Sequence, residues 1–226
     1  MIINIVNKVS GLERKPGILY VTANCEVADY LRDNQYPYVV NVDSEEACMN
    51  FWGHDYIMIG HDELLSDNEW LCKIYNRQCG IDNIIAQNKE ICIRETKQED
   101  IDRIYMMYDE ECEKYLESLP ILRKNEYSDY IKGLYRQYDM YGYGMYVITH
   151  LKSGRVIGRI GLEPKEDAAY LGYMIDRGYR GQGYATAAVD IFLEAIYKRY
   201  PGICIKAKVD DKNIASVHIL KKAGII

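Results

Sequence analysis

The feature that most constrains this chain is a glycine-containing segment between a strand-like run and a helix-like run. The segment reads Arg177-Gly-Tyr-Arg-Gly-Gln-Gly-Tyr-Ala185 and follows the apolar run Ala169–Ile175. Apolar residues then recur at the spacing of one helix face, at Ala185, Ala188, Val189, Phe192, Leu193 and Ile196. A strand, a glycine turn and a helix in this order point free backbone N–H groups at an anion. The arrangement therefore predicts a phosphate-binding site.

The residues of the turn narrow the kind of phosphate site. Gly181 and Gly183 let the main chain approach a phosphate closely, and Arg180 adds a charge that can pair with its oxygens. A nucleoside-triphosphate loop needs Gly-Lys-Ser/Thr, which does not occur, and a dinucleotide site needs a third glycine where Thr186 stands. The spacing that fits is Arg/Gln-x-x-Gly-x-Gly/Ala, which residues 180–185 match as Arg180-Gly-Gln-Gly-Tyr-Ala185. Taken alone, these six residues could also form an ordinary glycine turn ahead of a helix.

This spacing resembles motif A of the GNAT superfamily of acyl-CoA-dependent N-acyltransferases. A second segment, residues 203–226, predicts a strand, a turn and a helix, with Asn213 as its cap and Gly224 just past its end. Asn213-x-x-Ser216 followed by Lys222-Ala-Gly224 resembles the closing motif of the same superfamily, in the branch that includes the ribosomal-protein N-terminal acetyltransferases. Two motifs in the order found in the superfamily identify a member more specifically than either motif does alone.

The resemblance covers about residues 89–226 and implies a GNAT fold, an α/β (α+β) architecture with a mixed sheet flanked by helices. It also implies that acetyl-CoA is the cosubstrate. The strand before motif A would supply main-chain groups to the pantetheine arm and the thioester carbonyl. The implied coenzyme-binding residues are Tyr173, Met174, Ile175, Arg180, Gly181, Gln182, Gly183, Tyr184, Ala185, Asn213 and Ser216.

The implied chemistry is direct attack of an amine on the thioester, which requires a base, donors for the developing oxyanion and protonation of the thiolate. Glu163, at the end of the preceding strand, is the first candidate base and Asp176 the second; for each, the alternative is a surface carboxylate. Many family members place a tyrosine seven residues after the motif asparagine, as the proton donor. Here that position is Leu220.

Two classes of function follow. The first is an N-acetyltransferase that acts on a small amine or on a protein α-amine. The second is an acyl-CoA-binding regulatory or sensor module with little turnover, which Leu220 favours. In the family two more strands follow the last helix, whereas this sequence stops at Ile226. We expect either a truncated sequence or a sheet completed by a neighbouring segment or subunit. An unfinished sheet edge promotes pairing with a second copy, so a homo-oligomer is one expected arrangement.

Composition limits the compartment and the partners. The 226 residues carry a net charge of −6, which argues against a nucleic-acid partner. No apolar run approaches the ~18 residues that span a bilayer, and the N-terminus lacks the pattern of a signal peptide. The seven cysteines form no Cys-x-x-Cys pair, and the four histidines have no metal-ligand spacing. We therefore expect a cytoplasmic protein with free thiols, no metal and no membrane partner.

An acidic domain is expected ahead of the acetyltransferase-like part. Residues 1–88 carry 6 Lys and Arg against 13 Asp and Glu, whereas residues 89–226 carry 22 against 21. We place the boundary near Gln87–Lys89. Strand-like and helix-like runs alternate in the first part, which favours a small parallel sheet and is similar to the accessory α/β domain ahead of some bacterial GNAT modules. The expected strands are Gly17–Thr22, Tyr38–Val42 and Tyr56–Ile59, and the expected helices Glu26–Arg32, Glu45–Asn50 and Trp70–Arg77.

The second part contains the remaining elements of a GNAT sheet. Lys89–Glu95 predicts a strand, and Thr96-Lys-Gln-Glu99 a capping box for the helix that follows. The spacing of Ile131, Leu134, Tyr135 and Tyr138 predicts a second helix. Two strands, Met145–His150 and Arg155–Leu162, would then form a hairpin.

Overall fold

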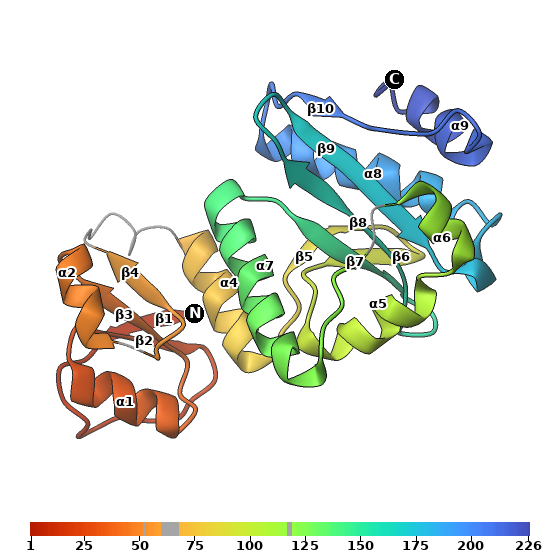
Figure 1. Cartoon of the computed structure of the whole chain (residues 1–226). Helices are drawn as coiled ribbons and strands as arrows, with labels where there is room; N and C mark the ends of the chain where they lie inside the picture. The colour runs from red at the N-terminus through yellow and green to blue at the C-terminus, as the bar shows by residue number, and fades with distance from the viewer. Residues whose placement is uncertain (52, 60–67, 117–118) are drawn as a thin grey trace. The chain divides into compact units, whose positions relative to one another are not determined.

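The computed structural model of the chain describes residues 1–51, 53–59, 68–116 and 119–226. These residues divide into two units, Met1–Asn83 and Ile84–Ile226 (Figure 1). The division falls a few residues before the predicted boundary at Gln87–Lys89. The reason is that strand β5 (Ile84–Gln87) pairs with β6 (Ile91–Arg94) and so joins the sheet of the second unit.

The first unit is a parallel sheet with helices on both faces. Its strands pair in chain order: β1 (Ile2–Ile5), β2 (Ile18–Thr22), β3 (Tyr38–Val42) and β4 (Ile57–Ile59). Its helices are α1 (Cys25–Asp33), α2 (Glu45–Cys48), the 3₁₀ turn η1 (Met49–Phe51) and α4 (Asn68–Cys79). The expected parallel sheet is confirmed, and β1 is an additional strand.

Successive residues of the buried strands in this unit face opposite sides of the sheet, as the two-residue period of a strand requires. Tyr20 and Val40 pack with Leu31 of α1, whereas Leu19 and Val39 pack with Leu71 of α4. The continuous apolar sequence of β2 and β3 therefore follows from burial on both faces. The sequence Ser66-Asp-Asn-Glu69 predicts a capping box ahead of the expected helix Trp70–Arg77, and this capping box begins outside the described residues.

The second unit contains a six-stranded mixed sheet in the order β10-β9-β8-β7-β6-β5 among the described residues. Its remaining strands are β7 (Met145–His150), β8 (Arg155–Pro164), β9 (Ala169–Ile175) and β10 (Ile205–Lys206). All neighbouring pairs are antiparallel except β9 and β10, which run parallel. The predicted hairpin and the motif A strand are confirmed.

Helices cover both faces of this sheet (Figure 1). They are α5 (Ile101–Met107), α6 (Glu110–Tyr115), α7 (Tyr127–Tyr141), α8 (Tyr184–Arg199) and α9 (Ile214–Lys222), with 3₁₀ turns η2 (Gln98–Asp100), η3 (Lys124–Glu126) and η4 (Arg177–Tyr179). Phe192 and Val189 of α8 are fully buried against one face. On the other face, Val147 and Met174 pack with Ile104 of α5 and Cys112 of α6.

The capping box expected at Thr96–Glu99 differs from the structure. Thr96 does not cap a helix, because its hydroxyl donates a hydrogen bond to the carbonyl of Met145 at 3.1 Å. Instead, Asp100 accepts a hydrogen bond from the N–H of Lys97 at 2.8 Å and two from Arg94. None of the seven cysteines, all of which lie in the described part of the chain, forms a disulfide bond. Within the described part of the chain, none of the helices has the length and apolar character that a membrane span requires.

Candidate functional site

A cavity of about 720 Å³ lies along the edge of β9. Strand β10 pairs with β9 only at Ala169 and Tyr170, so among the described strands none continues this edge toward Ile175. Residues from both sides of the sheet line the cavity, because Tyr173 and Ile175 alternate with Met174 along the strand. The cavity therefore connects the α8–α9 side of the sheet with the α6 side.

One wall of the cavity is the turn that the sequence singles out. Gly181 and Gly183 have φ angles of +72° and +86°, in the left-handed region that favours glycine. No described atom lies within 4 Å of a Cβ placed on either glycine, so the space in front of the turn is open. Gly183 is the N-cap of α8 and has no side chain that could accept a hydrogen bond from the N–H groups of the first turn.

The turn presents a series of free donors to this space. The backbone N–H groups from Gly181 to Thr186 donate no hydrogen bond to any described residue; the first bond of the series is from Ala187 to the carbonyl of Gly183. Unpaired N–H groups at the start of a helix carry the positive end of its dipole. The turn is therefore suited to bind a phosphate or pyrophosphate group.

Arg180 is already paired with protein groups. Its guanidinium contacts the carboxylate of Asp109 at 2.9 and 3.0 Å and that of Glu111 at 2.6 Å, and its Nε donates to the carbonyl of Ile175 at 2.8 Å. These contacts attach α6 to the turn between β9 and α8. The prediction that Arg180 pairs with phosphate oxygens therefore needs a qualification, since protein carboxylates hold its guanidinium here.

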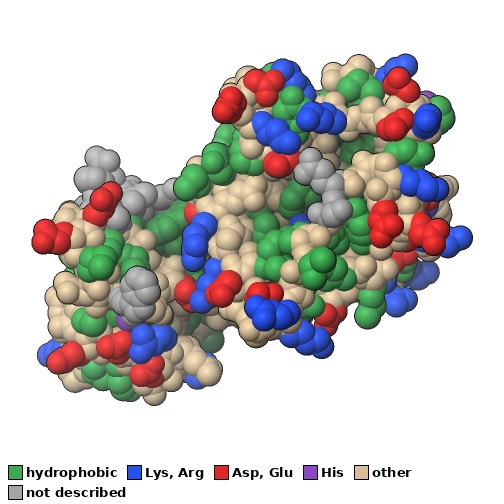
Figure 2. Space-filling model, in the orientation of Figure 1, with side chains coloured by type: hydrophobic (Ala, Val, Ile, Leu, Met, Phe, Trp, Pro, Cys, Tyr) green, Lys and Arg blue, Asp and Glu red, His purple; other side chains and the backbone are tan. Residues whose placement is uncertain are grey.

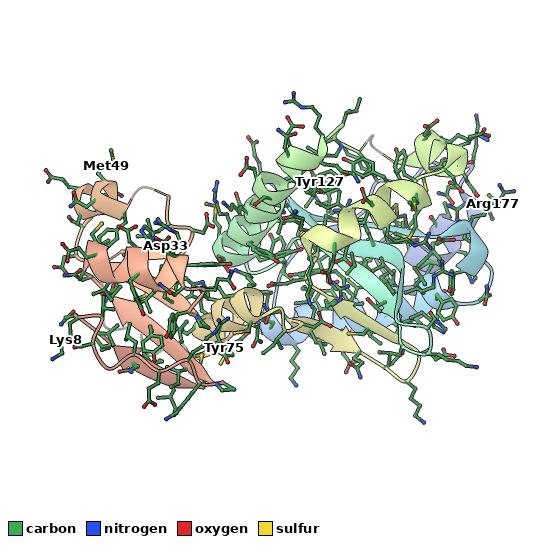
Figure 3. The ribbon with its side chains drawn as sticks, turned by 90° about the horizontal axis from the view of Figure 1, so that it is seen from below. Lys8, Asp33, Met49, Tyr75, Tyr127 and Arg177 are labelled. Atoms are coloured by element: carbon green, nitrogen blue, oxygen red, sulfur yellow. The ribbon has the colours of Figure 1, made fainter. Side chains whose placement is uncertain are left out.

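Arg177 is the first residue of the glycine-containing segment and lies three residues before Arg180. It is exposed, and its side chain forms no ion pair or hydrogen bond with the residues that the structure describes. In Figure 3 the side chain of Arg177 points away from the body of the second unit. Arg177 does not line the cavity, but its guanidinium, unlike that of Arg180, is not paired with a carboxylate of the described residues.

The predicted closing motif lies on the opposite side of the cavity. Asn213 caps α9, because its side chain accepts a hydrogen bond from the N–H of Ser216 at 3.2 Å. Both residues line the cavity, together with Ala215 and Ile219. The predicted N-cap is confirmed. Gly224 has a φ of +70° just past the end of α9, as predicted.

Tyr173 places a phenol beside Ser216. Its hydroxyl is buried and forms no hydrogen bond with a described residue, although Ser216 lies close to it. Burial raises the pKa of Tyr173, an effect that Ser216 partly offsets. Leu220, in contrast, is 2% exposed and belongs to the hydrophobic core.

Neither candidate base lines the cavity. The carboxylate of Asp176 pairs with Arg103 and accepts a hydrogen bond from the N–H of Gly178 at 2.7 Å, so it stabilises the turn. Glu163 is exposed at the end of β8 and forms an ion pair with Lys165 at 3.2 Å. Gln182 also lies outside the lining, and its side chain donates to the carbonyl of Gly178 at 3.0 Å.

Sequence reasoning missed the α6 wall of the cavity. This short helix contributes Glu111, Cys112 and Tyr115, and Leu116 follows it. Its N-cap is Asp109, which accepts a hydrogen bond from the N–H of Cys112 at 3.0 Å. An aspartate followed by Glu110 and Glu111 is a sequence signal for a helix start, and it could have identified α6.

Comparison with known proteins supports a relationship to acetyltransferases. A sequence model described as an acetyltransferase (GNAT) domain matches residues 90–226. The search of curated proteins gave no match.

Solved structures agree in fold. A ribosomal-protein-S5-alanine acetyltransferase from Vibrio fischeri superposes with a TM-score of 0.54 at 16% identity, covering 64% of this chain and 82% of its own. A ribosomal L7/L12 α-N-protein acetyltransferase, RimL, superposes with a TM-score of 0.51 at 19% identity, covering 63% of this chain and 80% of its own. A GNAT-family acetyltransferase from Bacillus anthracis superposes with a TM-score of 0.51 at 16% identity, covering 63% of this chain and 82% of its own. Because the sequence match spans more than half of the chain, the protein belongs to the GNAT family of acetyltransferases.

Proposed function

We propose that this protein is an acetyl-CoA-dependent N-acetyltransferase that transfers the acetyl group to a primary amine by direct attack on the thioester. The observation that supports this most strongly is the series of free N–H groups from Gly181 to Thr186 beside a cavity of about 720 Å³. Pyrophosphate would bind to this series, and the pantetheine arm would extend along the open edge of β9. Cavities of this volume are typical of cofactor sites.

Within this proposal β9 positions the thioester. Beyond Tyr170, no described strand pairs with this edge of β9. The N–H of Asp176 donates to the carbonyl of Ile157 on β8, so by alternation the main-chain groups of Met174 also face β8 and those of Tyr173 and Ile175 face the open edge. The carbonyl of Ile175 accepts from Arg180, which leaves both main-chain groups of Tyr173 and the N–H of Ile175 for the pantetheine amides and the thioester oxygen. Backbone donors fixed in a strand stabilise a developing oxyanion without reorganisation. Ser216 of the closing motif, which lines the cavity together with Asn213, would contact the pantetheine arm from the α9 side.

Glu163 is our candidate general base. By the register of the sheet it lies opposite Tyr170 on β9 and faces the same side as Met174, which lines the cavity. The side chain is 55% exposed, so it would act on the amine through a water molecule. Asp176 is the weaker candidate, because Arg103 and Gly178 already occupy its carboxylate.

Tyr173 is our candidate proton donor to the departing thiolate. Position 220 has no ionisable group, whereas the hydroxyl of Tyr173 is buried, unpaired among the described residues and part of a residue that lines the cavity. A phenol is already protonated at neutral pH, which a proton donor requires, and burial raises the pKa of Tyr173 further.

The acetyl-CoA-binding step is tested first, by titration calorimetry and by the shift in melting temperature with acetyl-CoA. Binding at micromolar concentration is expected. A protein that neither binds acetyl-CoA nor changes its melting temperature would contradict the proposal. Thiol release is then measured with a panel of small amines and of peptides with free α-amines.

The buried Leu220 supports a second candidate, a module that binds acyl-CoA for regulation with little turnover. The two candidates agree on acetyl-CoA binding and differ in thiol release. A protein that binds acetyl-CoA tightly and releases no thiol with any acceptor of the panel is a sensor, and turnover with one acceptor identifies an enzyme.

A further inference from the structure

Arg159 lies in the middle of β8 and is only 5% exposed. Among the described residues its side chain forms one hydrogen bond, from Nη2 to the hydroxyl of Tyr130 at 3.4 Å, and its Nε is buried without a partner there. A neighbouring arginine of the sheet provides a contrast. Arg94 is similarly buried, but it forms a bidentate pair with Asp100 at 2.8 and 2.9 Å.

A buried guanidinium without a carboxylate is costly. Arginine stays protonated in proteins, so it cannot relieve the cost by losing its charge. Removing an isolated charge from water is among the least favourable changes in a protein unless an opposite charge pairs with it. The Nε and Nη2 atoms form the edge of the guanidinium that accepts a carboxylate side-on. An anionic ligand at this edge would supply the missing partner.

The position of Arg159 on the sheet connects it to the proposed acceptor side. Its register partner on β9 is Met174, which lines the cavity, and directly paired side chains of neighbouring strands lie about 5 Å apart. Two residues after Arg159 on β8, and two residues before Met174 on the antiparallel β9, Gly161 pairs with Gly172. A Cβ placed on Gly161 would overlap the carbonyl oxygen of Gly144, whereas no described atom lies within 4 Å of a Cβ placed on Gly172, so the sheet surface is covered on the β8 side and open on the β9 side.

The surroundings of this surface fit an amine that carries an anionic group. Glu163 faces the same side of β8, two residues beyond Gly161, and helices α5, α6 and α7 border this face. Figure 2 shows hydrophobic side chains across the visible face of the second unit that these helices form. An acceptor held by Arg159 would lie over Gly172 of β9, with Arg159 toward one end and the candidate base Glu163 toward the other, next to the strand edge proposed for the thioester.

We propose that Arg159 binds a carboxylate of the acceptor, so that the substrate is a small amino acid or a short peptide whose carboxylate and amine lie a few bonds apart. The inference rests on the proposed acetyltransferase function and specifies its acceptor. Arg159 is a specificity residue in this scheme, and the proton transfers remain with other groups.

The test compares acceptors that differ only at the anionic group. Thiol release from acetyl-CoA is measured with amino acids and β-alanine, with their carboxamides, and with phosphoethanolamine as the phosphate counterpart. We expect kcat/KM to be about 30-fold or more higher for the acids than for the amides, the range found when a buried charge loses its partner. Preference for phosphoethanolamine would overturn the carboxylate assignment, and equal rates for acids and amides would overturn the inference.

Variants assign the preference to Arg159. Arg159→Met keeps the length of the side chain and removes its charge, and it should abolish the preference for acids while acetyl-CoA still binds in calorimetry. Arg155→Met, at the exposed start of the same strand, is the matched control and should keep the preference. If the methionine variant does not fold, Arg159→Lys retains the charge, loses the planar fork and should reduce the preference. An Arg159→Met protein that still prefers acids would overturn the inference.

A binding measurement separates this inference from the proposed function. The melting temperature of the wild-type protein is recorded with coenzyme A and either an acid or its amide at equal concentration. A shift with acids only supports the site even if no thiol is released. Turnover of amides and acids at equal rates, with no selective shift, contradicts the site and leaves the acetyltransferase function standing.

Discussion

The guanidinium of Arg180 holds the carboxylate of Asp109, 71 residues earlier in the chain, at nitrogen–oxygen distances of 2.9 and 3.0 Å. The same carboxylate caps α6 through the N–H of Cys112. The motif arginine therefore fixes one wall of the cavity to the anion-binding turn. In this arrangement Arg180 positions α6, and the backbone N–H groups from Gly181 to Thr186 are the donors that the turn offers to an anion.

The first prediction concerns this ion pair. Hydrogen bonding from Arg180 holds the pKa of Asp109 well below its usual range. A carboxyl whose pKa is lower in the folded state stabilises the fold above its unfolded pKa of about 3.9, and this contribution is lost as the pH falls toward the folded pKa. We expect Asp109→Asn to lower the free energy of unfolding by about 1 kcal/mol at pH 7, and by less as the pH falls below about 4.

Denaturant unfolding monitored by circular dichroism at several pH values measures this difference. Glu111→Gln is the control, because the side chain of Glu111 is 64% exposed and its pair with Arg180 is better screened. A difference between wild type and Asp109→Asn that stays constant from pH 7 to pH 3 would contradict the prediction.

The second prediction concerns the anion-binding turn. Ala185→Asp places a carboxylate in the first turn of α8, where the helix dipole favours it, so the fold should be retained. The same carboxylate would repel the pyrophosphate and compete for the free N–H groups. We expect a loss of acetyl-CoA affinity of at least about tenfold, since each 1.4 kcal/mol corresponds to that factor. Calorimetry with Ala185→Asn, which has the same shape without the charge, provides the control; equal losses in both variants would mean that bulk, not charge, is responsible.

The third prediction concerns Arg177. Its exposed guanidinium should attract the coenzyme phosphates electrostatically, so Arg177→Ala should weaken acetyl-CoA binding by a few fold at low ionic strength and by less at high ionic strength. Arg155→Ala, which removes an exposed arginine elsewhere in the sheet, should leave the affinity unchanged. A salt-independent loss, or no loss, would exclude a role for Arg177 in binding.

The fourth prediction concerns the proton donor. Tyr173→Phe removes only a hydroxyl that has no partner among the described residues, so the fold and the acetyl-CoA affinity should persist. If Tyr173 protonates the thiolate, kcat should fall by about 100-fold, the usual contribution of a general acid. The alkaline limb of the pH–rate profile should also change. An unchanged kcat would exclude Tyr173 as the donor.

The fifth prediction concerns the core that supports the site. Phe192 of α8 is fully buried, and its ring lies 5.9 Å from that of Tyr146 on β7. Phe192→Ala should reduce the free energy of unfolding by about 3–5 kcal/mol, because it removes apolar contacts and leaves a cavity. Leu151→Ala, at a 40% exposed position, should have a much smaller effect. Similar losses for the two variants would show that α8 does not anchor this core.

Elements with a long periodic pattern were predictable from the sequence. The apolar spacing of α7 and α8 and the runs of β7, β8 and β9 correspond closely to the observed bounds. Strand β1 was missed because its residues are mostly exposed and show no alternation. Helix α6, with six residues, is too short for a periodic pattern to identify it.

The glycine turn ahead of α8 and the capped helix α9 could be predicted from the sequence, because both depend on local geometry: glycines at positive φ and an asparagine cap. The roles of the charged side chains became clear from contacts between distant parts of the chain. Arg180 pairs with Asp109 and Asp176 pairs with Arg103, whereas Arg159 is buried and, among the described residues, forms a hydrogen bond with a tyrosine hydroxyl alone. The energy of a charge depends on its burial and on partners that are distant in sequence, and the spacing of residues contains neither.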